Sequence, residues 1–231
     1  MPPPLPIESQ WPIIDRSKIQ LFSLNTPNGI KVAVAFEELQ IPYEAHTVQI
    51  GKGEQFSAAF KSISPNSKIP AIVDLNGPGD KPFALMESGA ILIYLAERAG
   101  RLFPTDPAQR FKCLQWLFFQ VGHVGPMFGQ FGHFFKYARD KCDHPYPLER
   151  YSNETKRLLG VLEHELSDKE YLIGEYTIAD IATVPWVNGL SVGYGAGEAL
   201  QLSGFPRVQA WVDRVVARPA YQVGKDVAKV G

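Results

Sequence analysis

The stretch SPNSKIPAIV, residues Ser64–Val73, leads from a run of turn-forming residues directly into a short apolar strand. Pro70 stands at the first position of that strand, where a proline leaves neighbouring backbone groups without partners in the sheet. A cis Ile69-Pro70 bond in a tight turn is one reason for such a placement. The free backbone groups could receive an extended peptide. A turn that simply precedes a strand is the alternative, and this stretch alone leaves both interpretations open.

The residues before this stretch predict a β-α-β unit. The tetrapeptide Thr26-Pro27-Asn28-Gly29 separates a strand from a helix, because Thr26 is a natural N-cap and Pro27 suits the first helical position. The predicted elements, in chain order, are a strand over 19–24, a helix over 30–39, a strand over 43–48 and a short helical piece over 55–61.

The residues after the stretch predict a hairpin and a further helix. Two short strands, 71–75 and 83–86, are joined by the turn-rich run Asn76–Asp80. Ser88 then caps a helix whose apolar residues recur at helical spacing. The order through residue 100 is β-α-β, a helical link and β-β-α, which is the order of a thioredoxin-like domain.

Strand signals vanish from Phe103 onward, and the rest of the chain reads as helices. We therefore predict an α/β, thioredoxin-like N-terminal domain over 19–102 and an all-α helical-bundle C-terminal domain over 103–231. Within the helical part, Thr177 and Asp180 form a capping-box signature. The remaining residues, 1–18, are an N-terminal extension that we expect to lie on the surface as an arm.

Neither a secretion signal nor a membrane span is expected. The first residues include three consecutive prolines and no apolar core of the kind that a signal peptide has. The run 113–135 lacks Asp, Glu, Lys and Arg and is long enough to span a bilayer. Its Gln and His residues fall on one arc of a helix, however, so we expect a buried helix that bends at Pro126.

Composition excludes several function classes. The formal net charge is only -1 and the basic residues do not cluster, so neither a nucleic acid nor a membrane surface is expected as a partner. The chain has only two cysteines, Cys113 and Cys142, which fits a reducing cytoplasm. No zinc, P-loop or dinucleotide motif is present and the five histidines lack ligand spacing, so no metal site is expected.

The position after the first strand decides the chemistry. Thioredoxin-like domains normally carry a redox cysteine pair there, where the helix N-terminus lowers the pKa of a thiol. This chain has Thr26 and Asn28 instead, so any thiol must come from a ligand. Lowering a thiol pKa by two units takes roughly 2.7 kcal/mol, and one or two hydrogen bonds to a charged acceptor supply about 1.5–3 kcal/mol each. The same tetrapeptide is also an ordinary helix cap.

Several motifs on this fold resemble the glutathione transferase superfamily. The motifs that resemble the superfamily as a whole are Asn66–Ile72 and Glu87–Ala90. Five further motifs resemble its Nu class, and these are residues 26–29, 51–56, 114–118, 125–127 and 149–151. The Nu class is related to the fungal nitrogen-regulation prion protein. The resemblance runs from about residue 19 to residue 221.

The resemblance implies a glutathione site. Thr26 and Asn28 would face the glutathione sulfur, and the backbone at Ile69 would pair with the cysteinyl group across a cis Pro70. Glu87 and Ser88 would hold the γ-glutamyl ammonium and carboxylate. Further ligand-binding positions are Gln55 and Arg150, and Lys68 or Lys52 could reach the glycyl carboxylate.

The implied function is a cytoplasmic, homodimeric, glutathione-dependent disulfide-bond reductase with secondary transferase activity. Glutathione would be the cosubstrate, in reduced or disulfide form. Two alternatives stay open. The first is a transferase that mainly conjugates electrophiles, with Phe128, Phe131 and Phe134 shaping an apolar pocket. The second is a regulatory binding module without turnover. The sequence does not identify the physiological disulfide or electrophile.

Overall fold

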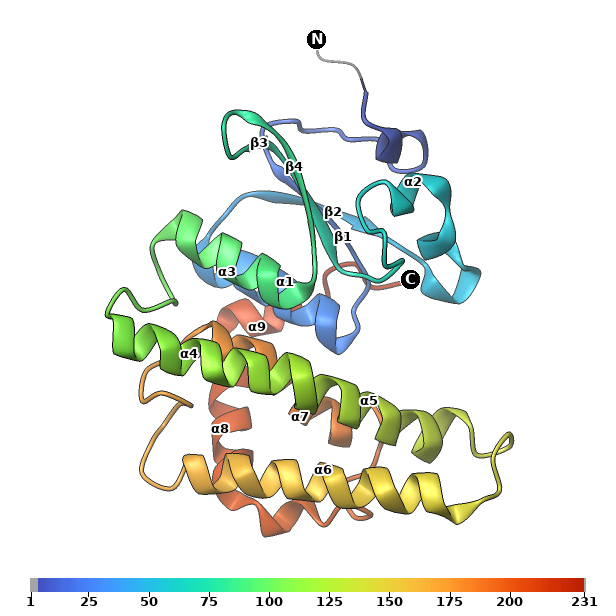
Figure 1. The fold of residues 1–231 in the computed structure, drawn as a ribbon, viewed down its shortest axis with the longest axis vertical. Coiled ribbons are helices and arrows are strands. Elements are labelled where there is room, and N and C mark those ends of the chain that lie inside the picture. The colour runs from blue at the N-terminus through green and yellow to red at the C-terminus, as the bar shows by residue number, and fades with distance from the viewer. Residues whose placement is uncertain (1–3, 231) are drawn as a thin grey trace. The chain divides into compact units, whose positions relative to one another are not determined.

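The computed structural model describes residues 4–230 of the 231-residue chain. Residues 1–3 of the extension and residue 231 lie outside the described part. The described residues form two compact units, one made of 4–100 and 219–230 and the other of 101–218. Figure 1 shows the strands in the first unit, whereas the second unit is helical. The predicted combination of a thioredoxin-like domain with a helical domain is confirmed.

The first unit is built on a four-stranded mixed sheet with the strand order β2-β1-β3-β4. Its strands are β1 Ile19–Ser23, β2 Tyr43–Thr47, β3 Ala71–Gly77 and β4 Lys81–Met86. β1 and β2 are parallel, whereas β3 runs antiparallel to both β1 and β4. The crossover between the two parallel strands is made by α1, Pro27–Leu39, as the predicted β-α-β unit requires.

The remaining helical elements of the first unit are short except for α3. They are η1 Pro6–Ser9, η2 Ile50–Lys52, η3 Glu54–Phe56, α2 Ala58–Lys61, α3 Ser88–Ala99 and α9 Pro219–Gly224. The predicted boundary places residues 219–224 in the helical domain, whereas in the structure α9 belongs to the first unit. α9 packs on α1, and Gly224 lies so close to Val34 that a Cβ there would stand 2.7 Å from the Val34 nitrogen.

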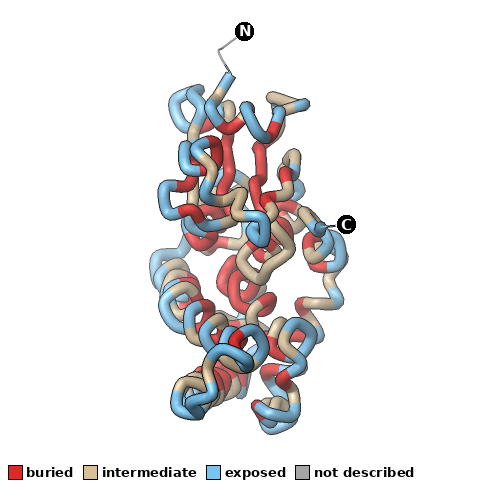
Figure 2. Tube along the Cα trace, turned by 90° about the vertical axis from the view of Figure 1, so that its right-hand side faces the viewer, coloured by how far each residue is buried: buried red, intermediate tan, exposed pale blue. Residues whose placement is uncertain are grey.

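Alternating side chains give the sheet two different faces. One face packs against α1 and α3, where Phe36 stacks on Tyr43 with ring centroids 4.6 Å apart. The other face carries a separate buried cluster that includes Phe22 and Val73. Figure 2 shows buried backbone running through the sheet between these two layers.

The N-terminal extension belongs to the second of these faces. Ile7 is fully buried and Trp11 is 8% exposed, and both are members of the cluster around Phe22. The expectation of an arm lying on the surface is therefore wrong for Ile7 and Trp11, whereas other residues of the extension, such as Gln10 and Ile14, are exposed. Ile7 and Trp11 are two isolated large apolar side chains in an irregular segment, and they gave no periodic signal that would reveal this burial.

The second unit consists of helices. These are α4 Pro107–Phe119, a π-helical turn Gln120–Val124, α5 Gly125–Gly132, a second π-helical turn His133–Tyr137, α6 Pro145–Glu165, α7 Ile178–Val192, η6 Leu202–Gly204 and α8 Pro206–Val216. A π-helical turn stands directly before Pro126, where a bend was predicted, and it shifts the backbone hydrogen bonds around the proline. Among residues 4–230, no helix is long and apolar enough to cross a membrane.

The predicted capping box at the start of α7 is confirmed. Thr177 is the N-cap, and the carboxylate of Asp180 accepts the Thr177 backbone N–H at 2.9 Å. The same carboxylate accepts hydrogen bonds from the Leu172 backbone N–H at 3.0 Å and from the Trp211 indole at 2.9 Å. Burial raises the pKa of Asp180 to about 6, against the effect of these donors, which lower it.

Candidate functional site

Three chain segments meet at one edge of the sheet in the first unit. β1 ends where β3 begins, because the two are antiparallel and Phe22 pairs with Ala71. β4 also ends there, since Met86 pairs with Ala71 on the other side. The residues that follow or precede these positions are Thr26, Pro70 and Glu87. Strand register therefore brings Thr26, Pro70 and Glu87 to a common edge.

The first helix presents neutral hydrogen-bonding groups at this edge. Thr26 is the N-cap of α1, and its hydroxyl oxygen accepts the Gly29 N–H at 3.4 Å. Because that oxygen acts as the acceptor, the hydroxyl hydrogen is left to donate elsewhere. Asn28 lies in the first turn and is partly exposed. A Cβ at Gly29 would overlap the Leu24 carbonyl oxygen, so glycine is what lets α1 start so close to β1.

The turn before β3 leaves a peptide group unpaired. The Ile69-Pro70 bond is cis. Neither the N–H nor the C=O of Ile69 has a hydrogen-bond partner among residues 4–230. The turn itself is held from within, since the Ser64 hydroxyl donates to the Lys68 carbonyl at 2.8 Å and the Ser67 N–H donates to the Ser64 carbonyl at 2.8 Å.

Gln55 contributes an unsatisfied acceptor. It lies in η3, and its side-chain oxygen is buried without a hydrogen-bond partner. Since a buried polar atom left alone costs about 1–3 kcal/mol, the group fits a donor supplied by a ligand. The candidate lysines, Lys52 and Lys68, are both exposed.

Glu87 and Ser88 begin α3. Glu87 is exposed and has a backbone φ of 69°, an unusual conformation for a residue with a side chain. Ser88 is the first residue of the helix and is buried. The backbone N–H groups of the first helical turn, together with the helix dipole, favour an anion at this end.

Sequence reasoning missed Lys31. This lysine lies on α1, one turn after Asn28, and is only 1% exposed. Burial lowers the pKa of Lys31 to about 7, and the nearby Glu87 carboxylate raises it in part. The available signal was a single lysine inside the apolar helical run Ile30–Phe36. A charge at a core-facing position of an amphipathic helix calls for a partner.

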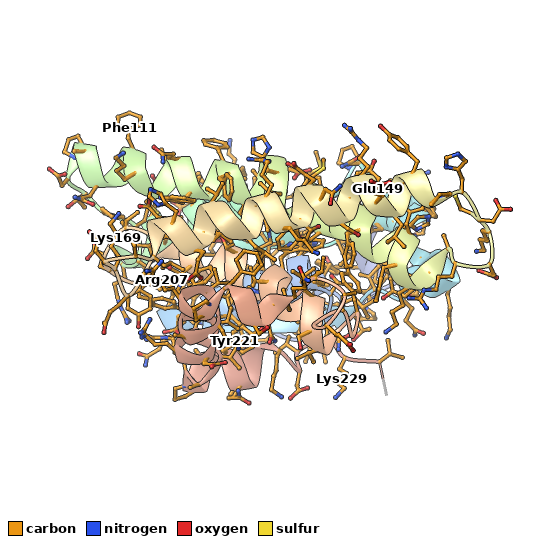
Figure 3. The ribbon with its side chains drawn as sticks, turned by 90° about the horizontal axis from the view of Figure 1, so that it is seen from below. Phe111, Glu149, Lys169, Arg207, Tyr221 and Lys229 are labelled. Carbon is orange, nitrogen blue, oxygen red and sulfur yellow. The ribbon has the colours of Figure 1, made fainter. Side chains whose placement is uncertain are left out.

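Arg150 belongs to the second unit and is described with that unit alone. It is exposed on α6, beside Glu149, which Figure 3 labels on the same helix. A groove of about 610 Å³ runs along this helix and is lined by Met127, Tyr146, Glu149, Arg150, Tyr151, Asn153, Glu154 and Arg157. Of the three residues expected to shape an apolar pocket, Phe128 and Phe131 are buried in the core of the unit. Phe134 is partly exposed, and its ring stacks on Tyr151 of this groove with centroids 5.7 Å apart.

The first unit thus has a candidate binding site for an extended, charged peptide. The backbone of Ile69 can pair with a peptide group, Gln55 can accept a hydrogen bond, and Glu87 with the start of α3 can meet an ammonium and a carboxylate. Thr26 and Asn28 provide neutral donors beside a positive helix end. Both cysteines lie in the other unit. Among the described residues, no group of three or more His, Cys, Asp or Glu side chains is placed to hold a metal ion.

Two family profiles match the chain. Residues 26–98 match the glutathione S-transferase N-terminal domain, and residues 125–219 match the glutathione S-transferase C-terminal domain. Among curated proteins, the chain is 45% identical over 204 residues to the disulfide-bond oxidoreductase YfcG of Escherichia coli, which covers 87% of this chain and 92% of that protein. It is 41% identical over 223 residues to the disulfide-bond oxidoreductase YghU of the same organism, and this match covers 93% of this chain and 76% of that protein.

Solved structures agree with these matches. A glutathione transferase family member from Pseudomonas fluorescens, with two glutathione molecules bound, has a TM-score of 0.95 and 50% identity, covering 96% of this chain and 99% of that one. A glutathione transferase from Pseudomonas putida, with one glutathione disulfide bound per subunit, has a TM-score of 0.94 and 48% identity, covering 96% of both chains. The resemblance found in the motifs is confirmed: the chain belongs to the glutathione S-transferase family and is of the Nu, or YfcG-like, type.

Proposed function

We propose that this chain is a glutathione-dependent disulfide-bond reductase with secondary glutathione transferase activity. The observation that carries the proposal is the end of β1, where Thr26 and Asn28 occupy the place of a redox cysteine pair. Because the site has no thiol of its own, both electrons must come from glutathione. The similarity to two proteins named as disulfide-bond oxidoreductases supports this direction of the chemistry.

The reaction is two successive thiol–disulfide exchanges. The thiolate of one glutathione attacks a substrate disulfide, which forms a mixed disulfide and releases the first substrate thiol. A second glutathione thiolate then attacks the glutathione sulfur of the mixed disulfide, which releases the second substrate thiol and leaves glutathione disulfide. Each departing thiolate takes up the proton that an attacking glutathione thiol had lost. The chain's own task is to bind glutathione and favour its thiolate.

The candidate residues divide this task. The Thr26 hydroxyl, the Asn28 amide and the N-terminal end of α1 stabilise the thiolate. The free backbone of Ile69, next to Pro70, pairs with the cysteinyl group. A second set holds the charged and polar ends of glutathione and consists of Gln55, Lys68, Glu87, Ser88 and Arg150.

We further propose that the protein is a cytoplasmic homodimer. Two free cysteines, one buried and one partly exposed, are compatible with a reducing compartment. The resemblance to the Nu class, which implies a homodimer, supports the proposed dimer.

An assay of hydroxyethyl disulfide reduction by glutathione tests the proposal. We expect the double variant Thr26→Ala, Asn28→Ala to lose about 100-fold in kcat/KM, because two thiolate-stabilising donors disappear. The matched control is Asn76→Ala, whose side chain is exposed at the opposite end of β3. Undiminished turnover in the double variant would remove the assigned roles.

Rates on an aryl halide and on a disulfide, measured side by side, separate the reductase from a mainly conjugating transferase. Two of the three rings that the transferase alternative assigns to an apolar pocket, Phe128 and Phe131, are buried, and Phe134 alone of the three is partly exposed, which supports the reductase. A wild-type protein that binds glutathione in a thermal-shift titration but turns over neither substrate would support a regulatory binding module.

A further inference from the structure

The N-terminal arm, residues 4–18, packs against the sheet and against α2, the short helix that precedes the turn before β3. Trp11 is its anchor. The indole ring makes edge-to-face contacts with Phe22 of β1, at 6.0 Å between centroids, and with Phe60 of α2, at 6.1 Å. The indole N–H donates to the Thr47 carbonyl at 3.0 Å. Trp11 therefore joins the sheet to α2, two elements that are far apart in sequence.

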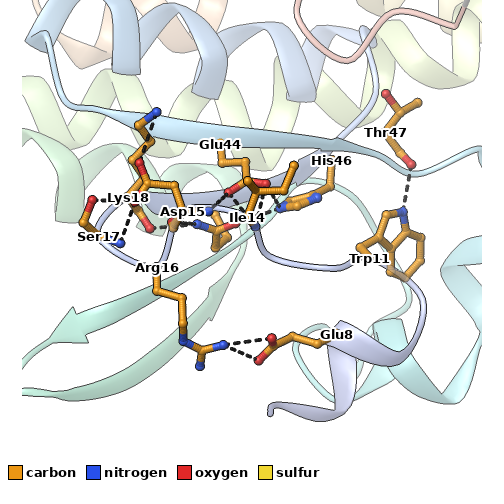
Figure 4. Close-up of polar contacts among 11 residues, drawn as sticks. Glu8, Trp11, Ile14, Asp15, Arg16, Ser17, Lys18, Glu44, His46 and Thr47 are labelled. Carbon is orange, nitrogen blue, oxygen red and sulfur yellow. Dashed lines mark hydrogen bonds and ion pairs between the residues drawn. The ribbon is translucent and has the colours of Figure 1, made fainter. Parts of the chain in front are cut away.

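The arm is fastened to the sheet by polar contacts on either side of this anchor. The Glu44 carboxylate of β2 accepts the backbone N–H groups of Ile14 and Asp15 at 2.9–3.2 Å, and Figure 4 shows these contacts. Arg16 forms an ion pair with Glu8 at 2.8 Å, which closes the arm on itself. The side chain of Ile14 is 90% exposed, so only the backbone is engaged there.

A short chain of contacts leads from Trp11 to the turn before β3. The Phe60 carbonyl accepts the Ser64 N–H at 3.0 Å. Ser64 in turn holds the turn through its hydroxyl, which donates to the Lys68 carbonyl at 2.8 Å. The Ile69 side chain packs against the same buried cluster that contains Trp11 and Phe60. Trp11 thus supports both the start and the end of the turn that carries the unpaired Ile69 peptide.

We infer that Trp11 is a positioning residue for glutathione, because its ring holds Phe60 and the Ser64–Ile69 turn at the place where the Ile69 backbone meets the ligand. The inference rests on the proposed function. Removal of the ring leaves a space beneath Phe60, and a buried aromatic cluster that is not filled lets its neighbours shift. A displacement of the peptide group weakens glutathione binding without touching the thiolate-stabilising residues on α1.

Steady-state kinetics with hydroxyethyl disulfide measure this effect. We expect Trp11→Leu to raise the KM for glutathione by about five- to ten-fold while kcat at saturating glutathione stays within about two-fold of wild type. Trp11→Phe keeps an aromatic ring but loses the hydrogen bond to Thr47, and we expect a rise of about two- to three-fold. The control is Ile14→Ala, on the same arm, for which the KM should not change.

Circular dichroism and thermal unfolding establish that each variant is folded before its kinetics are compared. If Trp11→Leu does not fold, Trp11→Phe decides the question by glutathione titration calorimetry. A wild-type KM in the folded variants, or a loss confined to kcat, overturns the inference and leaves the proposed function standing. A wild-type protein that neither binds nor uses glutathione overturns the proposed function, and the inference with it.

Discussion

At the scale of single residues, two buried polar groups lie on elements of the first unit that carry proposed glutathione contacts. Lys31 places an ammonium group in the interior of the first unit, and Gln55 leaves a buried oxygen without a partner. Buried polar groups normally find partners. Gln55 is itself a proposed glutathione contact, so a bound peptide that donates to its side-chain oxygen gives a physical reason for keeping the unpaired group.

Lys31 gives the stability of the protein a specific pH dependence. Burial lowers the pKa of Lys31 from 10.5 to about 7 in the folded state. Between these two pH values the unfolded chain holds a proton on Lys31 that the folded chain lacks, so the free energy of unfolding rises with pH across this window. Below about pH 7 both states are protonated at Lys31, and this residue adds no pH dependence. From pH 7.5 to pH 9 the gain is up to about 2 kcal/mol.

We expect Lys31→Met to abolish this rise, because methionine fills a similar volume and does not titrate. Urea unfolding of the two proteins at several pH values provides the measurement. Lys61→Met is the matched control, since Lys61 is an exposed lysine of α2 and its removal should leave the pH dependence intact. Parallel stability curves for wild type and Lys31→Met would show that Lys31 keeps an ordinary pKa.

At the scale of elements, the sequence predicted the helix caps and turns, because these depend on residues that are close together in the chain. The N-cap at Thr26, the turn into β3 and the capping box at Thr177 were all readable, because each involves residues within a few positions of one another. The burial of Trp11 and the packing of α9 on α1 were not readable. Both depend on contacts between distant segments, which leave no periodic trace in either segment.

The capping box of α7 yields a prediction at this scale. Asp180 accepts hydrogen bonds from Leu172, Thr177 and Trp211, so its carboxylate ties the start of α7 to the preceding loop and to α8. We expect Asp180→Ala to lower the free energy of unfolding by about 3 kcal/mol or more, since four buried donor groups on these three residues lose their acceptor. Thr177→Ala removes the cap on the Ala179 N–H and one of the four donors to Asp180, and it should cost about 1–2 kcal/mol.

Denaturant unfolding compares these variants with Asp168→Ala, an exposed aspartate in the same unit. The control should change stability by no more than about 0.5 kcal/mol. A small effect of Asp180→Ala, equal to that of the control, would mean that water or a rearranged loop satisfies the donors.

At the scale of the whole molecule, most of the candidate site could be predicted because it lies in one unit. Thr26, Ile69 and Glu87 come together through the register of β1, β3 and β4, and their motifs were each visible in the sequence. Arg150 comes from the other unit. The burial of Lys31 could not be predicted, because it depends on how α1 packs in the folded unit.

The proposed dimer has a physical argument in the second unit. Phe111 and Phe118 lie two turns apart on one side of α4 and are 71% and 63% exposed, and Figure 3 shows Phe111 projecting away from the helix. Aromatic side chains placed in this way gain free energy when a partner covers them. A second copy of the chain is the partner that family membership favours.

Native mass spectrometry with reduced and oxidised glutathione tests assembly and binding together. We expect a mass of two chains, carrying either two glutathiones or one glutathione disulfide per subunit. Glu87→Gln should keep the dimer but weaken glutathione binding by at least about ten-fold, because an ionic contact to the ligand ammonium is lost while the side-chain volume is retained. A wild-type monomer would contradict the dimer, and full ligand occupancy in Glu87→Gln would contradict the role of Glu87.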